Sequence, residues 1–421
     1  MTRRYFGTDG VRGVVGDELT AELVERLGKA AALWSESGRV FIGRDTRGSG
    51  PELEEAFARG VVSAGGNALL GGVLPTPAVA LLALDLGVVI TASHNPPEYN
   101  GVKIFGPGGQ KLTDAEEEAI EALIDVSPTA KPGRIDRVAI APDSYLEHIT
   151  ERYGSDLDGL RVAVDCANGA YADIAPKAFE SLGAQVTAIA AEPNGANINV
   201  GSGATDLRTL QQVVTSGEFD IGVAFDGDGD RMLALDAEGR LVDGDQILAI
   251  LALHLGVDLV AVTVMTNLGF HRFASAHGIR VVTTDVGDRY VLEALRQTGG
   301  LLGGEQSGHI IYLRDHVTGD GLAAALLLCG ALEGRTLAEA AAVMPQFPQV
   351  KENVPVATEE LPESLGREIA RVNRELGDEG RVLVRLSGTE PLVRILTEAA
   401  TAEKAAELCV TIRSLVRREL G

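Results

Sequence analysis

The chain has 421 residues and a net charge of −23, because its 60 Asp and Glu outnumber its 37 Lys and Arg. Its length predicts several domains of roughly 100–200 residues each, and its acidity disfavours nucleic acid and anionic membranes as partners. Hydrophobic residues make up 45% of the chain and charged residues 23%, a composition that excludes a disordered protein.

Three cysteines, Cys166, Cys329 and Cys409, stand far apart in the sequence, which argues against a zinc site and leaves at least one thiol unpaired. The opening MTRRYFGTDG has no apolar stretch of signal-peptide length, and the longest apolar run, residues 322–332, is too short to span a bilayer. We therefore expect a cytoplasmic protein, a monomer or homodimer, with neither membrane nor nucleic acid as a partner.

The chain alternates apolar runs with helical patterns. Residues 39–45 predict a strand that enters RDTRGSG, residues 51–65 predict a helix, and a further strand leads into ITASHNP. In a second round, strands begin at residues 161, 184 and 221, with helices over 172–183 and 207–217. In a third, strands begin at residues 258, 279 and 301, with helices over 270–278 and 289–299. Three such rounds predict three related α/β/α domains with mixed sheets.

The composition changes after about residue 345, where PQFPQVKENVPVATEELP is typical of a linker. Beyond it, a helical stripe from Leu365 to Leu376, two apolar strands around RLSGTEP and a last helix near 405–415 predict a smaller C-terminal α+β domain. The predicted domains are residues 1–150, 151–253, 254–347 and 348–421.

Ligands in open α/β sheets bind beyond the carboxyl ends of strands, which is where TASHNP, DGDGDR and GEQSGH stand. In DGDGDR, Asp226, Asp228 and Asp230 alternate with glycines before Arg231, and such closely spaced carboxylates favour a Mg²⁺ or Ca²⁺ site. The spacing does not fit an EF-hand. An acidic turn without a metal is the alternative.

Ser93 follows an apolar strand and precedes His94, so it is a candidate nucleophile, although the G-x-S-x-G elbow of α/β-hydrolases is absent. An ordinary turn serine is the alternative. In GEQSGH, Glu305, Ser307 and His309 suit the hydroxyls of a polar ligand, unless Glu305 is merely a solvated acid.

RLSGTEPLVR favours a phosphate site, because backbone N–H groups of Gly388 and Thr389, the Ser387 hydroxyl and two arginines, Arg385 and Arg394, form an oxyanion nest. A plain hairpin turn is the alternative.

Taken in order, FGTDGVRG, TASHNPPEYNGVKIF, DGDGDR, GEQSGH and RLSGTEP resemble the α-D-phosphohexomutase superfamily across the whole chain. YFGTDGVRG, TVMTNLG, VGDRY, GGEQSGH and TGDG look most like its bacterial phosphoglucosamine mutases. The resemblance implies four domains around one central cleft. It also implies interconversion of glucosamine 6-phosphate and glucosamine 1-phosphate through a phosphoserine enzyme and a bisphosphate, which supplies UDP-N-acetylglucosamine for peptidoglycan precursors.

The resemblance also implies roles for residues. Ser93 would carry the phosphoryl group, and the phosphoserine with Asp226, Asp228 and Asp230 would hold Mg²⁺. Glucosamine 1,6-bisphosphate or glucose 1,6-bisphosphate would be the activator. Arg12, Lys103 and Arg231 would stabilise charge, and His94, Lys103 and His309 are candidates for proton transfer. The implied substrate-binding residues are Glu305, Ser307, Arg385, Ser387, Gly388, Thr389 and Arg394.

Three alternatives stay open. A phosphoglucomutase or phosphomannomutase of the same superfamily would differ only in its sugar. A haloacid-dehalogenase-like phosphatase would use the D-x-D at Asp226 and Asp228, but Asp230 stands where that motif has Thr or Val. A regulator that only binds sugar phosphates would not need Ser93 and three aspartates.

Overall fold

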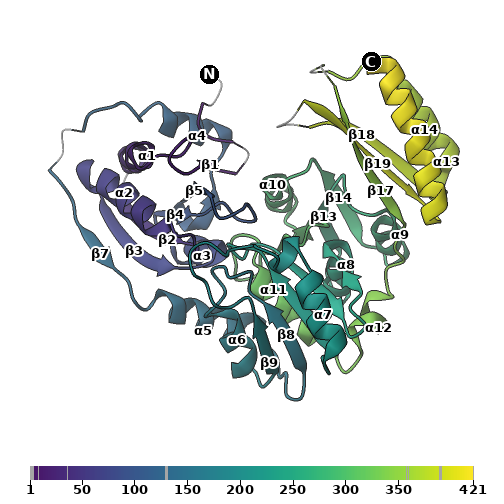
Figure 1. Ribbon diagram of the computed structural model, residues 1–421, viewed down its shortest axis with the longest axis horizontal. Helices are drawn as coiled ribbons and strands as arrows, with labels where there is room; N and C mark the ends of the chain where they lie inside the picture. The colour runs from purple at the N-terminus through teal and green to yellow at the C-terminus, as the bar shows by residue number, and fades with distance from the viewer. Residues whose placement is uncertain are drawn as a thin grey trace. The chain divides into compact units, whose positions relative to one another are not determined.

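The computed structural model describes residues 4–7, 9–35, 37–128, 131–356, 358, 360–387 and 391–420 (Figure 1). The chain forms two compact units, which we describe separately. The first contains the chain up to Thr263 together with Val282–Ala341, and the second contains Val264–Val281 together with the chain from Ala342.

The first sheet has the strand order β1-β5-β4-β2-β3-β7, with β6 paired to β5 at the edge. Strands β4, β2, β3 and β7 run parallel, whereas β5 is antiparallel to both of its neighbours in that order. Its strands are β1 (Val11–Val14), β2 (Arg39–Arg44), β3 (Asn67–Val73), β4 (Leu86–Ile90), β5 (Tyr99–Gly106), β6 (Gln110–Lys111) and β7 (Ile135–Arg137). Its helices are α1 (Ala21–Trp34), α2 (Gly50–Ser63), α3 (Thr76–Leu82) and α4 (Asp114–Glu121).

The second sheet has the order β12-β11-β10-β8-β9, in which β9, β8 and β10 are parallel. Its strands are β8 (Arg161–Asp165), β9 (Gln185–Ile189), β10 (Ile221–Phe225), β11 (Met232–Asp236) and β12 (Leu241–Val242). The accompanying helices are α5 (Ala141–Tyr153), α6 (Ala175–Ser181) and α7 (Arg208–Ser216). Helix α6 is shorter than predicted because residues 171–174 form turns and Pro176 stands in its first turn.

The third sheet has the order β14-β13-β15-β16. Its strands are β13 (Leu259–Thr263), β14 (Arg280–Thr284), β15 (Leu302–Gly304) and β16 (Ile310–Tyr312), and its helices are α8 (Gly244–His254), α10 (Asp288–Thr298), α11 (Gly321–Leu332) and α12 (Leu337–Ala341). Helix α11 is the longest apolar run of the sequence, and it is buried between α5, α8 and strands of the second and third sheets. Its all-round hydrophobicity therefore serves a protein core.

The second unit contains an antiparallel sheet of order β17-β19-β18. Its elements are β17 (Gln349–Pro355), β18 (Gly380–Leu386), β19 (Leu392–Ala399), α9 (Leu268–Ala276), α13 (Glu363–Leu376) and α14 (Ala402–Leu420). Val354, Val382, Val393 and Ile412 form part of its core.

The mixed sheets flanked by helices confirm the predicted α/β class. The four domain boundaries stay a prediction, because compactness divides the chain into two units rather than four. Across the described ranges, no helix is both long and apolar enough to cross a membrane.

Candidate active site

Ser93 lies on the connection that follows β4. It is buried, and its backbone adopts a left-handed φ of 51°, which residues other than glycine seldom do. Its Oγ donates a hydrogen bond of 2.7 Å to Asp226 Oδ2 and lies 3.2 Å from Nδ1 of His94. The structure therefore brings the predicted nucleophile to the predicted carboxylate loop.

Three buried carboxylates meet in the turn between β10 and β11. One oxygen each of Asp226, Asp228 and Asp230 lies within 4.8 Å of the others. The glycines between them are needed: a Cβ on Gly227 would lie 2.7 Å from the Ser93 carbonyl oxygen, and a Cβ on Gly229, whose φ is 77°, would lie 2.3 Å from the ring of Tyr171. Gly227 therefore lets the turn pack against the Ser93 loop, and Gly229 lets it pack against Tyr171.

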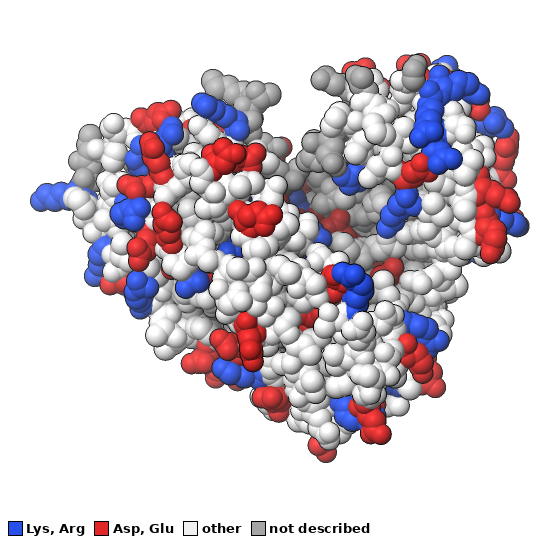
Figure 2. Space-filling view, in the orientation of Figure 1, with Lys and Arg blue, Asp and Glu red and all other residues white. Residues whose placement is uncertain are grey.

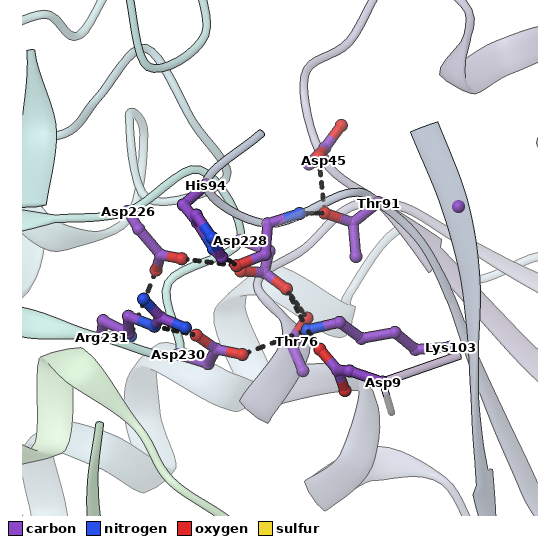
Figure 3. A network of polar contacts seen from close by, with 12 residues as sticks. Asp9, Asp45, Thr76, Thr91, His94, Lys103, Asp226, Asp228, Asp230 and Arg231 are labelled. Carbon is purple, nitrogen blue, oxygen red and sulfur yellow. Dashed lines mark hydrogen bonds and ion pairs between the residues drawn. The ribbon is translucent and has the colours of Figure 1, made fainter. Parts of the chain in front are cut away.

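Lys103 reaches the same carboxylates from β5, as Figure 3 shows. Its Nζ lies 2.8 Å from Asp228, 3.1 Å from Asp230 and 3.1 Å from Asp9. Burial alone would lower the pKa of Lys103, but these three carboxylates raise it well above its usual range. Lys103 is therefore a fixed positive charge.

The carboxylate cluster fits a divalent cation. Asp228 Oδ1 and Asp230 Oδ1 are buried and have no hydrogen-bond partner among the described residues. Burial, together with the charges of Asp230 and Asp228, raises the pKa of Asp226 well above its ordinary value. Hard carboxylate oxygens are the ligands that Mg²⁺ and Ca²⁺ prefer, and such an ion would relieve this repulsion.

A cleft of about 280 Å³ opens beside this cluster. Its lining residues come from β1 and the loop before it, the Ser93 and aspartate loops, the start of α4, the first turn of α10 with the loop before it, and the loop after β15. They are Asp9, Arg12, His94, Asp114, Asp230, Arg231, Val286, Gly287, Asp288, Arg289, Tyr290, Glu305 and His309. Figure 2 shows acidic and basic side chains interspersed over the visible face of the molecule. The described lining carries three arginines and five acids, and each arginine lies beside an acid: Arg12 beside Asp9, Arg231 beside Asp230 and Arg289 beside Asp114. The cleft therefore offers guanidinium groups to an anion without an excess of positive charge.

The pKa values of the two histidines of the cleft shift in opposite directions. Burial, together with the nearby guanidinium groups of Arg231 and Arg12, lowers the pKa of His94 to about 4. Burial would also lower the pKa of His309, but Asp288 and Asp230 raise it above its usual value. His309 Nε2 lies 3.2 Å from Asp288. The two rings are therefore suited to opposite directions of proton transfer.

Glu305 and Ser307 do not share one environment. Glu305 lines the cleft, where its Oε1 accepts a 3.1 Å hydrogen bond from the Gly287 N–H and burial raises its pKa. Ser307 is exposed and is absent from the described residues that line the cleft.

The predicted phosphate loop lies in the second unit, between β18 and β19. Arg385 and Arg394 stand directly opposite each other in the antiparallel ladder, and Arg394 Nη2 donates to Ser387 Oγ at 3.3 Å. Like charges at opposed positions repel, so this hairpin is suited to an anion. Gly388 and Thr389 lie outside the described residues.

Sequence reasoning missed several residues around the cluster. Asp9 lies between Lys103 and Lys111, and Lys111 forms an ion pair with Asp288. Asp9 stands in a polar loop before β1, whereas Lys111 ends β6 and Asp288 begins α10. Asp320 of TGDG is not in the cleft: it caps α11 and accepts hydrogen bonds from two buried tyrosine hydroxyls.

The sequence matches four family descriptions in succession. These are phosphoglucomutase/phosphomannomutase alpha/beta/alpha domain I over residues 3–130, domain II over 143–239, domain III over 243–347 and the C-terminal domain over 333–415.

Similar proteins agree over the full length. Phosphoglucosamine mutase of Mycobacterium ulcerans is 48% identical, with 98% of this chain and 99% of that protein covered. The enzyme of the same name from Saccharopolyspora erythraea is 49% identical, with 97% and 100% covered.

Among solved structures, a phosphoglucomutase/phosphomannomutase family protein of Burkholderia thailandensis gives a TM-score of 0.86 at 24% identity, with 100% of this chain and 98% of that chain covered. N-acetylphosphoglucosamine mutase of Aspergillus fumigatus, in complex with GlcNAc-6P and magnesium, gives 0.67 at 20% identity, with 100% and 96% covered. These structures share the fold. The four family matches and the full-length relatives show that the chain belongs to the phosphohexomutase superfamily, among the phosphoglucosamine mutases.

Proposed function

We propose that this phosphohexomutase interconverts glucosamine 6-phosphate and glucosamine 1-phosphate, with Ser93 as the phosphoryl carrier. The observation that carries the proposal is the 2.7 Å hydrogen bond from Ser93 Oγ to Asp226 in a three-carboxylate cluster, beside a cleft whose lining includes Arg12 and Arg231. The names of the full-length relatives support the sugar.

In the proposed reaction, the phosphoserine gives its phosphoryl group to one hydroxyl of the hexosamine phosphate. The bisphosphate turns over, and its other phosphate returns to Ser93 Oγ. Asp226, Asp228 and Asp230 hold Mg²⁺, which neutralises charge on the transferring phosphoryl group when it is bound. Lys103, Arg12 and Arg231 add fixed positive charge around the same group.

The charge states rank the candidates for proton transfer. Lys103 keeps its proton because three carboxylates surround it. His94 is neutral near pH 7 and lies 3.2 Å from Ser93 Oγ, so it is suited to accept a proton. His309 holds its proton more tightly and is suited to donate one.

Binding of the sugar phosphate is shared in this proposal. Glu305 accepts hydrogen bonds from the sugar, with a smaller role for the exposed Ser307. The Arg385, Ser387 and Arg394 loop, together with Gly388 and Thr389, takes the phosphate that does not react. Glucosamine 1,6-bisphosphate or glucose 1,6-bisphosphate phosphorylates Ser93 to start the cycle. A cytoplasmic location, supported by three free, buried cysteines, completes the proposal.

The test compares the wild-type protein with Ser93→Ala. We expect a mass increase of about 80 Da on wild-type protein treated with glucose 1,6-bisphosphate, and no increase and no mutase activity in the variant. Ser181→Ala, which removes a helix-end serine outside the site, serves as the control and keeps both properties. Appreciable turnover by folded Ser93→Ala protein contradicts the phosphoserine mechanism.

The sugar is tested by competition. Glucosamine 1-phosphate should give a higher kcat/KM than glucose 1-phosphate or mannose 1-phosphate. A preference for either of the latter would instead favour the phosphoglucomutase or phosphomannomutase alternative, and would leave the phosphoserine mechanism standing.

A further inference from the structure

The loop that carries Ser93 is held by a buried arginine outside the cleft. Arg47 follows β2, is only 1% exposed and is not among the described residues that line the cleft. Its Nε donates to Asp45 Oδ2 at 2.9 Å. Its two terminal nitrogens donate to four main-chain carbonyls of one loop, those of Ser93, Asn95, Pro96 and Tyr99. All five N–H groups of the guanidinium are thereby matched with acceptors.

Asp45, the ion-pair partner of Arg47, also helps to hold the N–H of Ser93, through Thr91. Thr91 Oγ1 donates to Asp45 Oδ2 at 2.6 Å and accepts from the Ser93 N–H at 2.9 Å. The Arg47 N–H in turn donates to Asp45 Oδ1 at 3.0 Å. Figure 3 shows the link from Asp45 to Thr91 beside the carboxylate cluster. Both main-chain polar groups of Ser93 are therefore fixed by Asp45 and Arg47, directly or through Thr91.

Such support has a specific use at this residue. The left-handed backbone of Ser93, with φ of 51°, is unfavourable for a residue with a Cβ and persists only where its surroundings enforce it. That backbone conformation aims Oγ at Asp226. Phosphoryl transfer depends mainly on the positioning of the reacting oxygen, so relaxation of this loop would misplace it.

We propose that Arg47 is a positioning residue for phosphoryl transfer: it fixes the loop over residues 93–99 so that Ser93 Oγ faces the metal-binding carboxylates. This inference rests on the proposed role of Ser93 as phosphoryl carrier. Arg47 itself contacts neither the sugar nor the phosphoryl group, so its loss should affect the chemical step more than substrate binding.

The first test is Arg47→Lys. An ammonium has three donors in place of five, so at least two of the five acceptors lose their hydrogen bond from residue 47. Asn199 Nδ2 still donates to the carbonyls of Ser93 and Asn95, at 2.8 and 3.2 Å, so the loop is loosened rather than released. We expect kcat, and the rate at which glucose 1,6-bisphosphate phosphorylates Ser93, to fall about a hundredfold, with KM changed by about twofold or less. Arg39→Lys is the matched control: Arg39 begins the same strand and pairs with Asp85 at 2.5 Å, so kcat should remain at the wild-type value.

The second variant, Thr91→Val, keeps the side-chain shape and removes the hydroxyl between Ser93 and Asp45. We expect a fall in kcat of about tenfold. Thermal unfolding of each variant checks that the fold persists, and Mg²⁺ titration checks that the carboxylate cluster does. If Arg47→Lys does not fold, Thr91→Val decides the question.

Each outcome has one meaning. A wild-type protein without mutase activity would overturn the proposed function, and this inference with it. An active wild type whose folded variants keep kcat within about twofold of normal, or lose only substrate affinity, would overturn the role of Arg47 alone. A fall in kcat with KM retained supports it.

Discussion

Only one of the two carboxylate oxygens of Asp228 accepts hydrogen bonds from the described residues. Its Oδ2 accepts hydrogen bonds from Thr76 Oγ1 at 2.6 Å and Lys103 Nζ at 2.8 Å, while its buried Oδ1 has no hydrogen-bond partner among the described residues. The two donors fix the carboxylate and leave its other oxygen available to a cation. A buried oxygen in that state is costly unless a ligand completes it.

Replacing this carboxylate should therefore weaken the metal site. Asp228→Asn removes one anionic ligand, and we expect Mg²⁺ affinity, measured by calorimetric titration, to fall about tenfold or more together with kcat. Asp206→Asn, which alters an ion pair with Arg208 outside the site, is the control. Equal Mg²⁺ affinity in the two variants would show that Asp228 is not a ligand.

At the scale of elements, the hairpin of β18 and β19 contains one arginine opposite another arginine and one arginine opposite a glutamate. Arg385 faces Arg394 across the ladder, whereas Arg381, on the same strand, pairs with the fully buried Glu398 at 2.6 Å. Two like charges meet at the first position, which favours an anion nearby, whereas the second position holds an ion pair within the protein. We therefore expect the first position to serve binding and the second to serve stability.

This contrast predicts different effects of the same substitution. Arg394→Met should raise KM for the sugar phosphate about tenfold or more, because a charged hydrogen bond contributes roughly 1.5–3 kcal/mol. Arg381→Met should leave KM near normal but reduce the free energy of unfolding by about 3 kcal/mol, because Glu398 stays buried without its partner. Kinetics and denaturant unfolding of both variants provide the check. Identical profiles would contradict this division of roles.

The same elements show what sequence can foresee. Loops that carry Ser93 or Asp226 were predictable, because an apolar strand followed by a polar, glycine-containing run marks a strand end beyond which ligands bind. The role of Arg47 was not, because its acceptors are mostly main-chain carbonyls, which have no residue-type signature. Lys111 and Asp288 were missed because their contact joins segments that only the tertiary fold brings together.

At the scale of the whole molecule, the second compact unit is discontinuous in sequence. The segment Val264–Val281, which contains α9, belongs with the chain from Ala342. Asn267 and Phe347 exchange two hydrogen bonds, of 2.9 and 3.0 Å, and the Leu268 N–H donates to Glu398. The compact unit that holds the C-terminal residues therefore also includes a segment that precedes the linker in the sequence.

A truncation after residue 341 should consequently disturb more than the part removed. We expect a lower thermal midpoint and rapid proteolysis within residues 264–281, because the buried Phe270 and Phe273 lose part of their packing. Replacing residues 264–281 of the truncated chain by a short Gly/Ser linker should restore resistance to protease. A simple truncation as resistant as the full-length protein would show that α9 is stable without the C-terminal residues.

The discontinuity of the second unit also bears on synthesis at the ribosome. Chains emerge from the N-terminus at roughly 5–20 residues per second, so α9 leaves the exit tunnel before any residue of β17, β18 or β19 exists. The apolar side of α9, which includes Phe270, therefore stays exposed until the ribosome has made the rest of the first unit and then the C-terminal strands. Nascent chains that stall just before residue 342, when α9 has left the tunnel, should therefore bind hydrophobic-segment chaperones more than chains stalled before residue 264.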